Sequence, residues 1–283
     1  SYFYRYSFFA ALLAKCFGKK TYFTGGIDSL DSDYASAFNY KIQALFFKLC
    51  YWVADSCIIV SQSDLKNIFK VSSLKKKLSY SEHVINTKLF IADVPKEKIF
   101  TSIVWMGDEG NVVRKGVDKA LQIFAELKKI PEFVDYRFVI IGRKGEGEVL
   151  VRSIIDKYNL KGSVELKGEV SEEDKINLLK QSKYYFQLSL YEGFGLAALE
   201  ALCANNIIIH SGKGGLANPI YKEQLLFDID NDFDSELLKL VNKLACFTPI
   251  TSYDNLLEYY DIQRRKDDFE AIIVNGKSNY KLK

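Results

Sequence analysis

The sequence predicts an α/β fold with two Rossmann-like, parallel-sheet domains, and we expect the first of these domains to be incomplete. Along most of the 283 residues, short apolar segments alternate with segments whose apolar residues recur at helical spacing. Such alternation is typical of right-handed βαβ crossovers and a parallel sheet. The length suits two domains. A glycine-rich turn near residue 193 also joins an apolar run to a helical pattern.

The composition limits the classes of function. The chain is 48% hydrophobic and 27% charged, which is typical of a soluble globular protein, and its net charge of +3 indicates no nucleic-acid partner. Five widely spaced cysteines without a Cys-x-x-Cys pair favour free thiols over disulfides or zinc. With two histidines in the chain, we expect no metal site. No apolar run approaches the ~18 residues of a membrane span, and no signal-peptide pattern opens the chain.

Residues 1–95 are expected to form a partial N-terminal domain. The chain opens with Ser inside a helical pattern, so we expect it to start part-way through a domain. Aromatic and basic residues in the first helix permit a membrane-surface role, but packing on a sheet is favoured because a strand follows at once. The expected elements alternate between helices (2–17, 38–53, 61–71) and strands (20–24, 56–60, 78–80).

Residues 96–250 are expected to form a second, complete Rossmann-like domain, and residues 251–283 a C-terminal segment with a helix over 253–275. Strands are predicted near 101–106, 137–141, 163–167, 184–189, 206–210 and 224–228. Helices are predicted near 117–130, 148–159, 172–182, 195–204 and 234–245.

The turn after the apolar run Tyr184 to Leu190 predicts an anion site. It holds Glu192, Gly193 and Gly195, and Glu200 follows one turn into the next helix. Free N–H groups and the helix dipole favour negative charge at such a turn. Glycine has no Cβ, so a phosphate can approach the main chain closely. Two carboxylates flanking this site suit a ligand that carries both hydroxyls and phosphate.

The nine residues Glu192-Gly-Phe-Gly-Leu-Ala-Ala-Leu-Glu200 resemble the Glu-x7-Glu signature of the retaining, nucleotide-sugar-dependent glycosyltransferases of family 4, which have the GT-B fold. The resemblance extends from about Ile103 to Ile220. Four further segments occur in that family's order and spacing: Arg114 to Asp118, Phe138 to Gly142, Val164 to Gly168, and Gly214-Gly215.

The resemblance implies an enzyme that moves a sugar from a nucleoside-diphosphate sugar to a glycan or lipid-linked acceptor. It also implies that no metal is required, that the C-terminal helix packs back on the first domain, and that the protein is cytoplasmic. Polysaccharide-assembly enzymes of this kind often work at the inner face of the cell membrane, which permits a peripheral membrane contact.

The resemblance also implies roles for residues of the turn. Glu192 would contact hydroxyls of the transferred sugar near the anomeric carbon, and Glu200 would bind the ribose hydroxyls. Gly193 would allow close approach of the β-phosphate. The N–H groups of Phe194, Gly195 and Leu196 would bind that phosphate. Glu192 would then be catalytic by positioning and charge stabilisation, because retention in this family is thought not to need a protein base.

Cations are expected to hold the donor diphosphate. Lys115 matches the family's lysine and is expected to open a helix at the carboxyl edge of the sheet. The family's arginine is missing, because Asp108 follows Gly107, and Arg114 is a candidate substitute. Arg143 lies in a glycine-rich loop, which does not have the Gly-x-Gly-x-x-Gly spacing and is interpreted as lining the donor cleft.

Several segments depart from the family's pattern. Gly25 replaces a histidine of the acceptor side, while Asp28 keeps its register without an assigned role. Asp31-Ser-Asp33 matches the metal–diphosphate motif of the other large glycosyltransferase fold, but a three-residue pattern in a polar loop is explained better by chance. His83 and His210 are left without a role; for His210, packing and a ligand contact are equally open.

Two other functions remain open at this stage. The missing arginine and the incomplete first domain also suit a non-catalytic scaffold or nucleotide-sugar-binding component of a larger assembly. The other alternative, a sugar epimerase of GT-B fold, uses the same architecture, but it lacks this Glu-x7-Glu turn and ranks last.

Overall fold

The computed structural model describes residues 5–26, 30, 35–71, 76–91, 94–247 and 254–275. Asp28, Asp31 and Asp33, which the sequence analysis discussed, lie outside the described residues. The chain divides into two compact units. Unit 1 comprises Ser1–Ile85, Glu192–Phe194 and Tyr259–Lys283, and unit 2 comprises Asn86–Tyr191 and Gly195–Glu258.

Unit 1 is built on a three-stranded parallel sheet with the order β1-β2-β3. Its strands are β1 (Tyr22–Thr24), β2 (Ser56–Ile59) and β3 (Leu78–Tyr80), and its first helices are α1 (Arg5–Cys16), α2 (Ala37–Val53) and α3 (Gln62–Val71). Phe23 and Phe47 are fully buried in the core between sheet and helices. The Lys77 ammonium donates to the carbonyls of Tyr51, Trp52 and Ala54, and so satisfies the C-terminus of α2.

The end of the chain forms α10 (Asp254–Tyr259) and α11 (Ile262–Asn275). The prediction of one helix over 253–275 is therefore wrong at Tyr260, whose carbonyl instead accepts a hydrogen bond from the Ile85 N–H at 3.0 Å. Within unit 1, α11 is bonded to the segment after β3, where the Ser81 hydroxyl donates to Asp268 at 2.9 Å.

Unit 2 contains a six-stranded parallel sheet with the order β6-β5-β4-β7-β8-β9. The two central strands are β4 (Glu97–Ile103) and β7 (Ser182–Gln187). From β4 the chain continues outward to one side, and from β7 to the other. The remaining strands are β5 (Arg137–Ile141), β6 (Val164–Gly168), β8 (Ile207–His210) and β9 (Leu225–Leu226).

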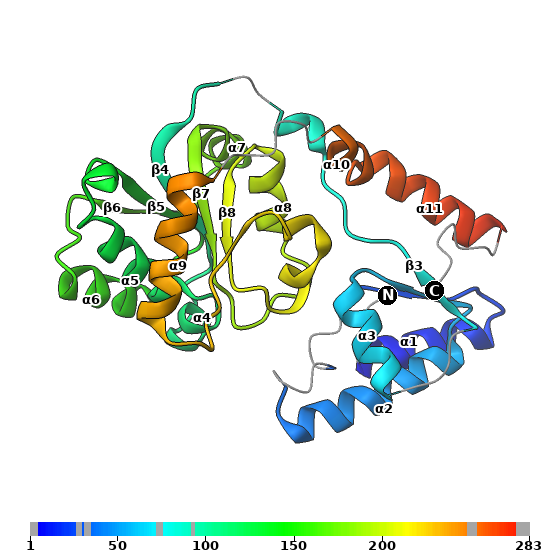
Figure 1. Ribbon diagram of the computed structural model, residues 1–283. Coiled ribbons are helices and arrows are strands. Elements are labelled where there is room, and N and C mark those ends of the chain that lie inside the picture. Colours follow the sequence, from blue (N-terminus) through cyan, green and yellow to red (C-terminus); the bar gives the residue numbers. More distant parts are fainter. Residues whose placement is uncertain are drawn as a thin grey trace. The chain divides into compact units, whose positions relative to one another are not determined.

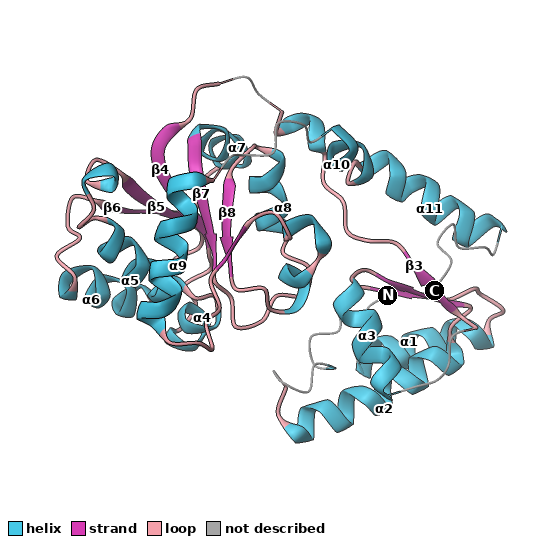
Figure 2. Cartoon of the chain, in the orientation of Figure 1, coloured by secondary structure: helices cyan, strands magenta, loops and turns pink. Residues whose placement is uncertain are grey.

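Helices cover this sheet, as Figures 1 and 2 show. They are α4 (Glu109–Arg114), α5 (Val117–Leu127), α6 (Glu148–Lys157), α7 (Glu172–Gln181), α8 (Leu196–Cys203) and α9 (Phe233–Cys246). Short 3₁₀ turns span Thr87–Leu89, Pro131–Phe133, Gly214–Ala217 and Pro219–Tyr221. In the core, the Phe100 ring stacks on Tyr184 and Phe186 at centroid distances of 4.6 and 5.0 Å.

The predicted α/β class and both parallel sheets are confirmed. Two details of unit 2 differ from the prediction. Strand β4 ends at Ile103, before the predicted limit of 106. Helix α4 was not predicted; it begins because the Asp108 carboxylate accepts a hydrogen bond from the Asn111 N–H at 2.6 Å. Among the described residues, no helix is both long and apolar enough to cross a membrane.

Candidate functional site

The sheet of unit 2 has one topological switch point, between β4 and β7. Open parallel sheets place ligands at the carboxyl ends of their strands at such a point. The segments that leave the two strands touch there, because the Leu190 N–H donates to the Arg114 carbonyl at 2.8 Å. The contact brings the corner Arg114–Gly116 next to the segment that leads into the Glu192 turn.

Gly116 makes this contact possible. Its φ of 68° lies in the left-handed region, and a Cβ at this position would be 2.0 Å from the Leu188 carbonyl oxygen. Lys115 is half-buried and ends α4, and Gly116 begins α5, so the expectation that Lys115 opens a helix is wrong. The neighbouring Arg114 guanidinium is oriented by a 2.6 Å hydrogen bond to the Asn111 side chain.

The glycine-rich loop after β5 packs on the segment 104–108. A Cβ at Gly142, Gly145 or Gly147 would lie 2.0, 2.5 or 2.4 Å from a backbone carbonyl oxygen of that segment. The Met106 N–H of that segment donates a hydrogen bond to the Arg143 carbonyl at 2.9 Å. The side chain of Arg143 is exposed. The glycines therefore serve close packing between two loops of the same edge, and Arg143 is placed at that edge with its guanidinium in solvent.

The turn after β7 has the predicted form. Glu192 and Gly193 are half-buried, Phe194 is buried, and Gly195 has a left-handed φ of 87° where α8 begins. The Gly195 carbonyl accepts hydrogen bonds from the Leu199 N–H at 2.9 Å and from a tyrosine hydroxyl at 3.3 Å. Leu196 is exposed at the first position of α8. The N–H groups of this first turn are the ones that an α-helix leaves without an intrahelical partner.

Within unit 1, the turn residue Phe194 packs against His83. The two rings meet edge to face with their centroids 5.4 Å apart. Arg265 Nη1 lies 2.8 Å from His83 Nδ1, and since a guanidinium only donates, that nitrogen accepts. Burial, aided by the Arg265 charge, lowers the pKa of His83 to about 4. Sequence patterns assigned His83 no role; in the structure it is a neutral support for the turn.

Glu200 is oriented by a residue that sequence reasoning missed. Its Oε2 lies 2.9 Å from the Lys175 ammonium of α7, and both side chains are only 16% exposed. Lys175 also binds Glu172 at 2.8 Å. Burial raises the pKa of Glu200, and the Lys175 charge offsets part of that rise. The carboxylate is therefore fixed through one oxygen in a position one turn into α8.

His210 ends β8 and is 5% exposed. With Tyr221, whose ring centroid is 5.6 Å away, it lines a pocket of about 450 Å³ formed with the two 3₁₀ turns that follow β8. Burial, aided by the charge of Lys243, lowers the pKa of His210 to about 4. The ring is neutral at physiological pH and belongs to the wall of this pocket.

This burial predicts a pH dependence of stability. A pKa lowered below the unfolded value of about 6.5 means that His210 stabilises the fold fully above that pH and loses its contribution as the pH falls toward 4. Between pH 7.5 and 5 the free energy of unfolding should fall by about 2 kcal/mol because of His210.

Urea unfolding of the wild type and of His210→Phe at both pH values measures this change. The free energy of unfolding of the variant should fall by about 2 kcal/mol less over this interval. Equal losses would contradict the assignment. His83 acts in the same direction and remains in both proteins.

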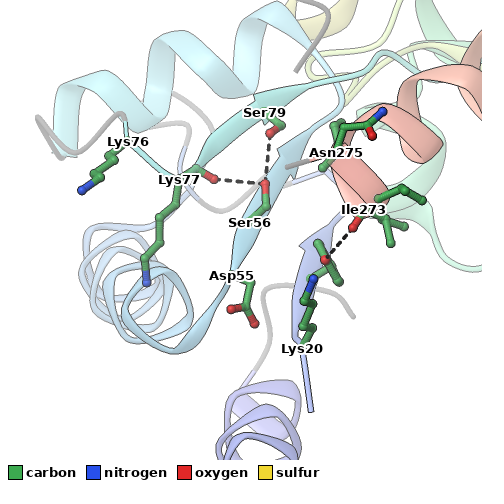
Figure 3. Close-up of a pocket in the computed structure, with 11 residues that line it drawn as sticks. Lys20, Asp55, Ser56, Lys76, Lys77, Ser79, Ile273 and Asn275 are labelled. Carbon is green, nitrogen blue, oxygen red and sulfur yellow. Dashed lines mark hydrogen bonds between the residues drawn. The ribbon is translucent and has the colours of Figure 1, made fainter. Parts of the chain in front are cut away.

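A second pocket, of about 380 Å³, lies in unit 1 at the amino ends of the three strands (Figure 3). Its polar groups bond to one another: the Ser56 hydroxyl is 3.0 Å from that of Ser79 and 3.2 Å from the Lys77 carbonyl. The Lys77 ammonium donates a hydrogen bond to the Ala54 carbonyl at the end of α2. Because parallel sheets place ligands at the opposite, carboxyl edge, we take the switch point of unit 2 as the candidate site.

Within the described ranges, no group of three or more His, Cys, Asp or Glu side chains is placed to hold a metal ion.

Part of the chain is similar to known glycosyltransferases. Residues 110–245 match the family model described as "Glycosyl transferases group 1". The chain is 32% identical over 163 residues to a GDP-mannose:cellobiosyl-diphosphopolyprenol alpha-mannosyltransferase of Xanthomonas oryzae pv. oryzae, an alignment that covers 50% of this chain and 40% of the relative. With the GPI3 subunit of the Saccharomyces cerevisiae phosphatidylinositol N-acetylglucosaminyltransferase it shares 27% identity over 129 residues, covering 46% of this chain and 28% of that protein. The alignments thus span less than half the length of either relative.

Among the solved structures that share the fold are the following two, and the fold is of the GT-B type, as predicted. Anabaena Alr3699/HepE in complex with UDP superposes with a TM-score of 0.74 at 12% identity, covering 95% of this chain and 76% of that one. The sucrose-phosphate synthase of Thermosynechococcus elongatus gives a TM-score of 0.69 at 21% identity, covering 95% of this chain and 69% of the other.

Proposed function

We propose that this protein, whose residues 110–245 match the model of glycosyl transferases group 1, is a retaining glycosyltransferase of family 4 that uses a nucleoside-diphosphate sugar. The observation that carries the proposal is the contact, at the switch point, of the corner Arg114–Gly116 with the segment that leads into the Glu192 turn. The fold is shared with Alr3699/HepE, which was solved in complex with UDP, and this supports a nucleotide-dependent activity.

The residues of the site suit the departure of a nucleoside diphosphate. As the bond between the anomeric carbon and the phosphate oxygen breaks, its electron pair leaves with the diphosphate. Lys115 and Arg114 would neutralise the charge that develops there, with Arg143 at the same edge. The N–H groups of the turn at Phe194, Gly195 and Leu196 would bind the β-phosphate.

The two carboxylates would bind the sugars at either end of the donor. Glu200 accepts hydrogen bonds from the ribose hydroxyls, since an ionised carboxylate is purely an acceptor. Glu192 positions the transferred hexose. The acceptor hydroxyl attacks on the face that the phosphate leaves, and the departing phosphate takes its proton, so no protein base and no metal is required.

The acceptor is proposed to be a glycan or a lipid-linked sugar in glycoconjugate synthesis at the cytoplasmic side of a membrane. Two relatives support this class by their names, which include cellobiosyl-diphosphopolyprenol and phosphatidylinositol. The name of the first also includes GDP-mannose, whereas Alr3699/HepE was solved with UDP.

One observation favours a second candidate, a nucleotide-sugar-binding scaffold without turnover. Asp108 stands where the family has a cation, and its carboxylate is used to begin α4. Arg114 would have to replace the missing charge. Nucleotide binding without sugar transfer or donor hydrolysis would favour this candidate over the enzyme.

The test is the binding of UDP, GDP, ADP and CMP by thermal shift and calorimetry, with Glu200→Gln as the variant. One diphosphate should stabilise the wild type by about 2.7 kcal/mol at roughly 100 times its dissociation constant. Glu200→Gln should weaken the binding of that nucleotide at least about tenfold, because a hydrogen bond to a charged group is worth roughly 1.5–3 kcal/mol.

The matched control is Glu172→Gln, which removes the other carboxylate bound to Lys175 and is 68% exposed. It should leave nucleotide binding nearly unchanged. If all four nucleotides fail to bind the folded wild type, or if both variants weaken binding equally, the assignment of Glu200 to the donor site is wrong.

A further inference from the structure

Trp105 is a large aromatic side chain that stays exposed at the carboxyl edge of the sheet of unit 2. It lies two residues beyond the end of β4 and is 56% exposed. Its neighbours Val104 and Met106 are buried in the main core of the unit. Single exposed apolar residues are common on protein surfaces, so the position and the support of Trp105 decide whether it has a role.

The side of the sheet on which Trp105 lies follows from the main chain. The N–H groups on either side of it, those of Val104 and Met106, donate at 2.9 Å to carbonyls of β5 and of the loop after it. The chain therefore stays extended past the end of β4, and side chains alternate along an extended chain. Trp105 shares a face with Ile103, which packs against the cluster that contains Leu178 of α7.

The carboxylate that we propose for the ribose lies on this same side. Helices α7 and α8 contact each other, and Lys175 in the first turn of α7 binds Glu200 of α8 at 2.9 Å. Both helices follow strands of a parallel sheet, so both begin at its carboxyl edge. Trp105 and Glu200 are thus on one face and at one edge of the same sheet.

The Trp105 ring is held in place while it stays exposed. A Cβ at Gly107 would lie 2.8 Å from the Cε2 and Cζ2 atoms of the indole, so the ring takes the space of a side chain. The Trp105 carbonyl accepts a hydrogen bond from the Asn111 side chain, whose oxygen accepts another from Arg114 at 2.6 Å. A ring fixed in this way loses little conformational entropy when a flat ligand covers it.

We propose that the base of the donor nucleotide stacks on Trp105. The inference rests on the proposed function, because it takes Arg114 to be at the diphosphate and Glu200 at the ribose. The base is bonded to that ribose, and it is the flat part of such a ligand. The transferred hexose is at the opposite end of the diphosphate, which we assign to Glu192. Every base has a face that can stack, so Trp105 adds affinity without choosing the base.

Calorimetry with UDP, GDP, ADP and CMP tests the contribution of the ring. Trp105→Ala should weaken the binding of the nucleotide that binds the wild type by about tenfold or more, because the base loses its stacking partner. Trp105→Phe should keep the affinity within about threefold, because a smaller ring still stacks. Inorganic pyrophosphate, which has no base, should bind the wild type and Trp105→Ala alike.

The matched control is Trp52→Ala, the same change at the other tryptophan of the chain. Trp52 lies in unit 1 and is 69% exposed. This variant should bind the nucleotide as the wild type does. Equal losses in Trp52→Ala and Trp105→Ala would overturn the proposal, because the effect would not depend on the edge of the sheet of unit 2.

Fluorescence measures the stacking itself. In Trp52→Phe the single remaining tryptophan is Trp105. Saturation with the nucleotide should quench its emission, with the dissociation constant that calorimetry gives. In Trp105→Phe the remaining Trp52 emission should not change. Saturation of Trp52→Phe without any change in emission would overturn the proposal.

The results separate this inference from the function on which it rests. If all four nucleotides fail to bind the folded wild type, both are wrong, because there is no donor site. If Glu200→Gln weakens nucleotide binding and Trp105→Ala does not, the donor site stands and Trp105 is outside it. A loss of pyrophosphate affinity in Trp105→Ala as large as the loss of nucleotide affinity would show that Trp105 supports the loops rather than the base.

Discussion

Replacing Lys115 by methionine should lower kcat/KM for sugar transfer by about 100-fold or more, with much smaller effects on stability. Removal of one fixed charge or donor that stabilises a transition state typically costs that much. Methionine keeps most of the length of the half-buried side chain and removes only the ammonium. The corner that carries it stays in place, since it is held by the Arg114 carbonyl and by Gly116 through main-chain contacts.

The control for this variant is Lys119→Met, the same change one turn later in α5. It should retain activity within about threefold, because Lys119 follows the corner rather than forming it. Initial rates with the nucleotide sugar identified by the binding screen measure both variants. An activity of Lys115→Met equal to that of Lys119→Met would remove Lys115 from the donor site.

Gly116→Ala should destabilise unit 2 by at least about 3 kcal/mol, whereas Gly162→Ala should cost only about 1–2 kcal/mol. Both glycines are left-handed, with φ of 68° and 85°, so both variants bear the conformational cost of an L residue. A Cβ at Gly162 meets nothing within 4 Å, but at Gly116 it would lie 2.0 Å from the Leu188 carbonyl oxygen. The two segments at the switch point would have to separate.

Urea unfolding of the two variants measures the difference, and nucleotide calorimetry follows its effect on the site. If Gly116→Ala unfolds at equilibrium like Gly162→Ala, then the two segments separate at little cost, and the corner is not the rigid support that the geometry indicates.

The sequence was most informative where the structure is decided locally. The turn from β7 to α8 is specified by an apolar run, two glycines and a helical pattern within a short stretch of chain, and its predicted form is confirmed where Gly195 begins α8. The prediction that Lys115 opens a helix was wrong because it overlooked α4. This helix depends on a single capping residue, Asp108, in a segment that was interpreted as a loop.

Other features depend on residues far apart in the chain. Beyond Ile103, where β4 ends, the Met106 N–H donates to the Arg143 carbonyl in the loop after β5. Lys175 contacts Glu200 from another helix, and His83 contacts Phe194 within unit 1 although the two residues lie far apart in the sequence. No periodicity or motif near these residues indicates such pairs, so sequence reasoning had no means of finding them.

The ion pair between Lys175 and Glu200 also has a thermodynamic consequence. Ordering a mobile side chain when a ligand binds costs roughly 0.5–1.5 kcal/mol of conformational entropy. In this protein the rotamer of Glu200 is selected when the helices pack, before any ligand arrives. A hydroxyl-bearing ligand would then meet a preorganised acceptor, and the entropy of fixing that carboxylate would belong to folding rather than to recognition.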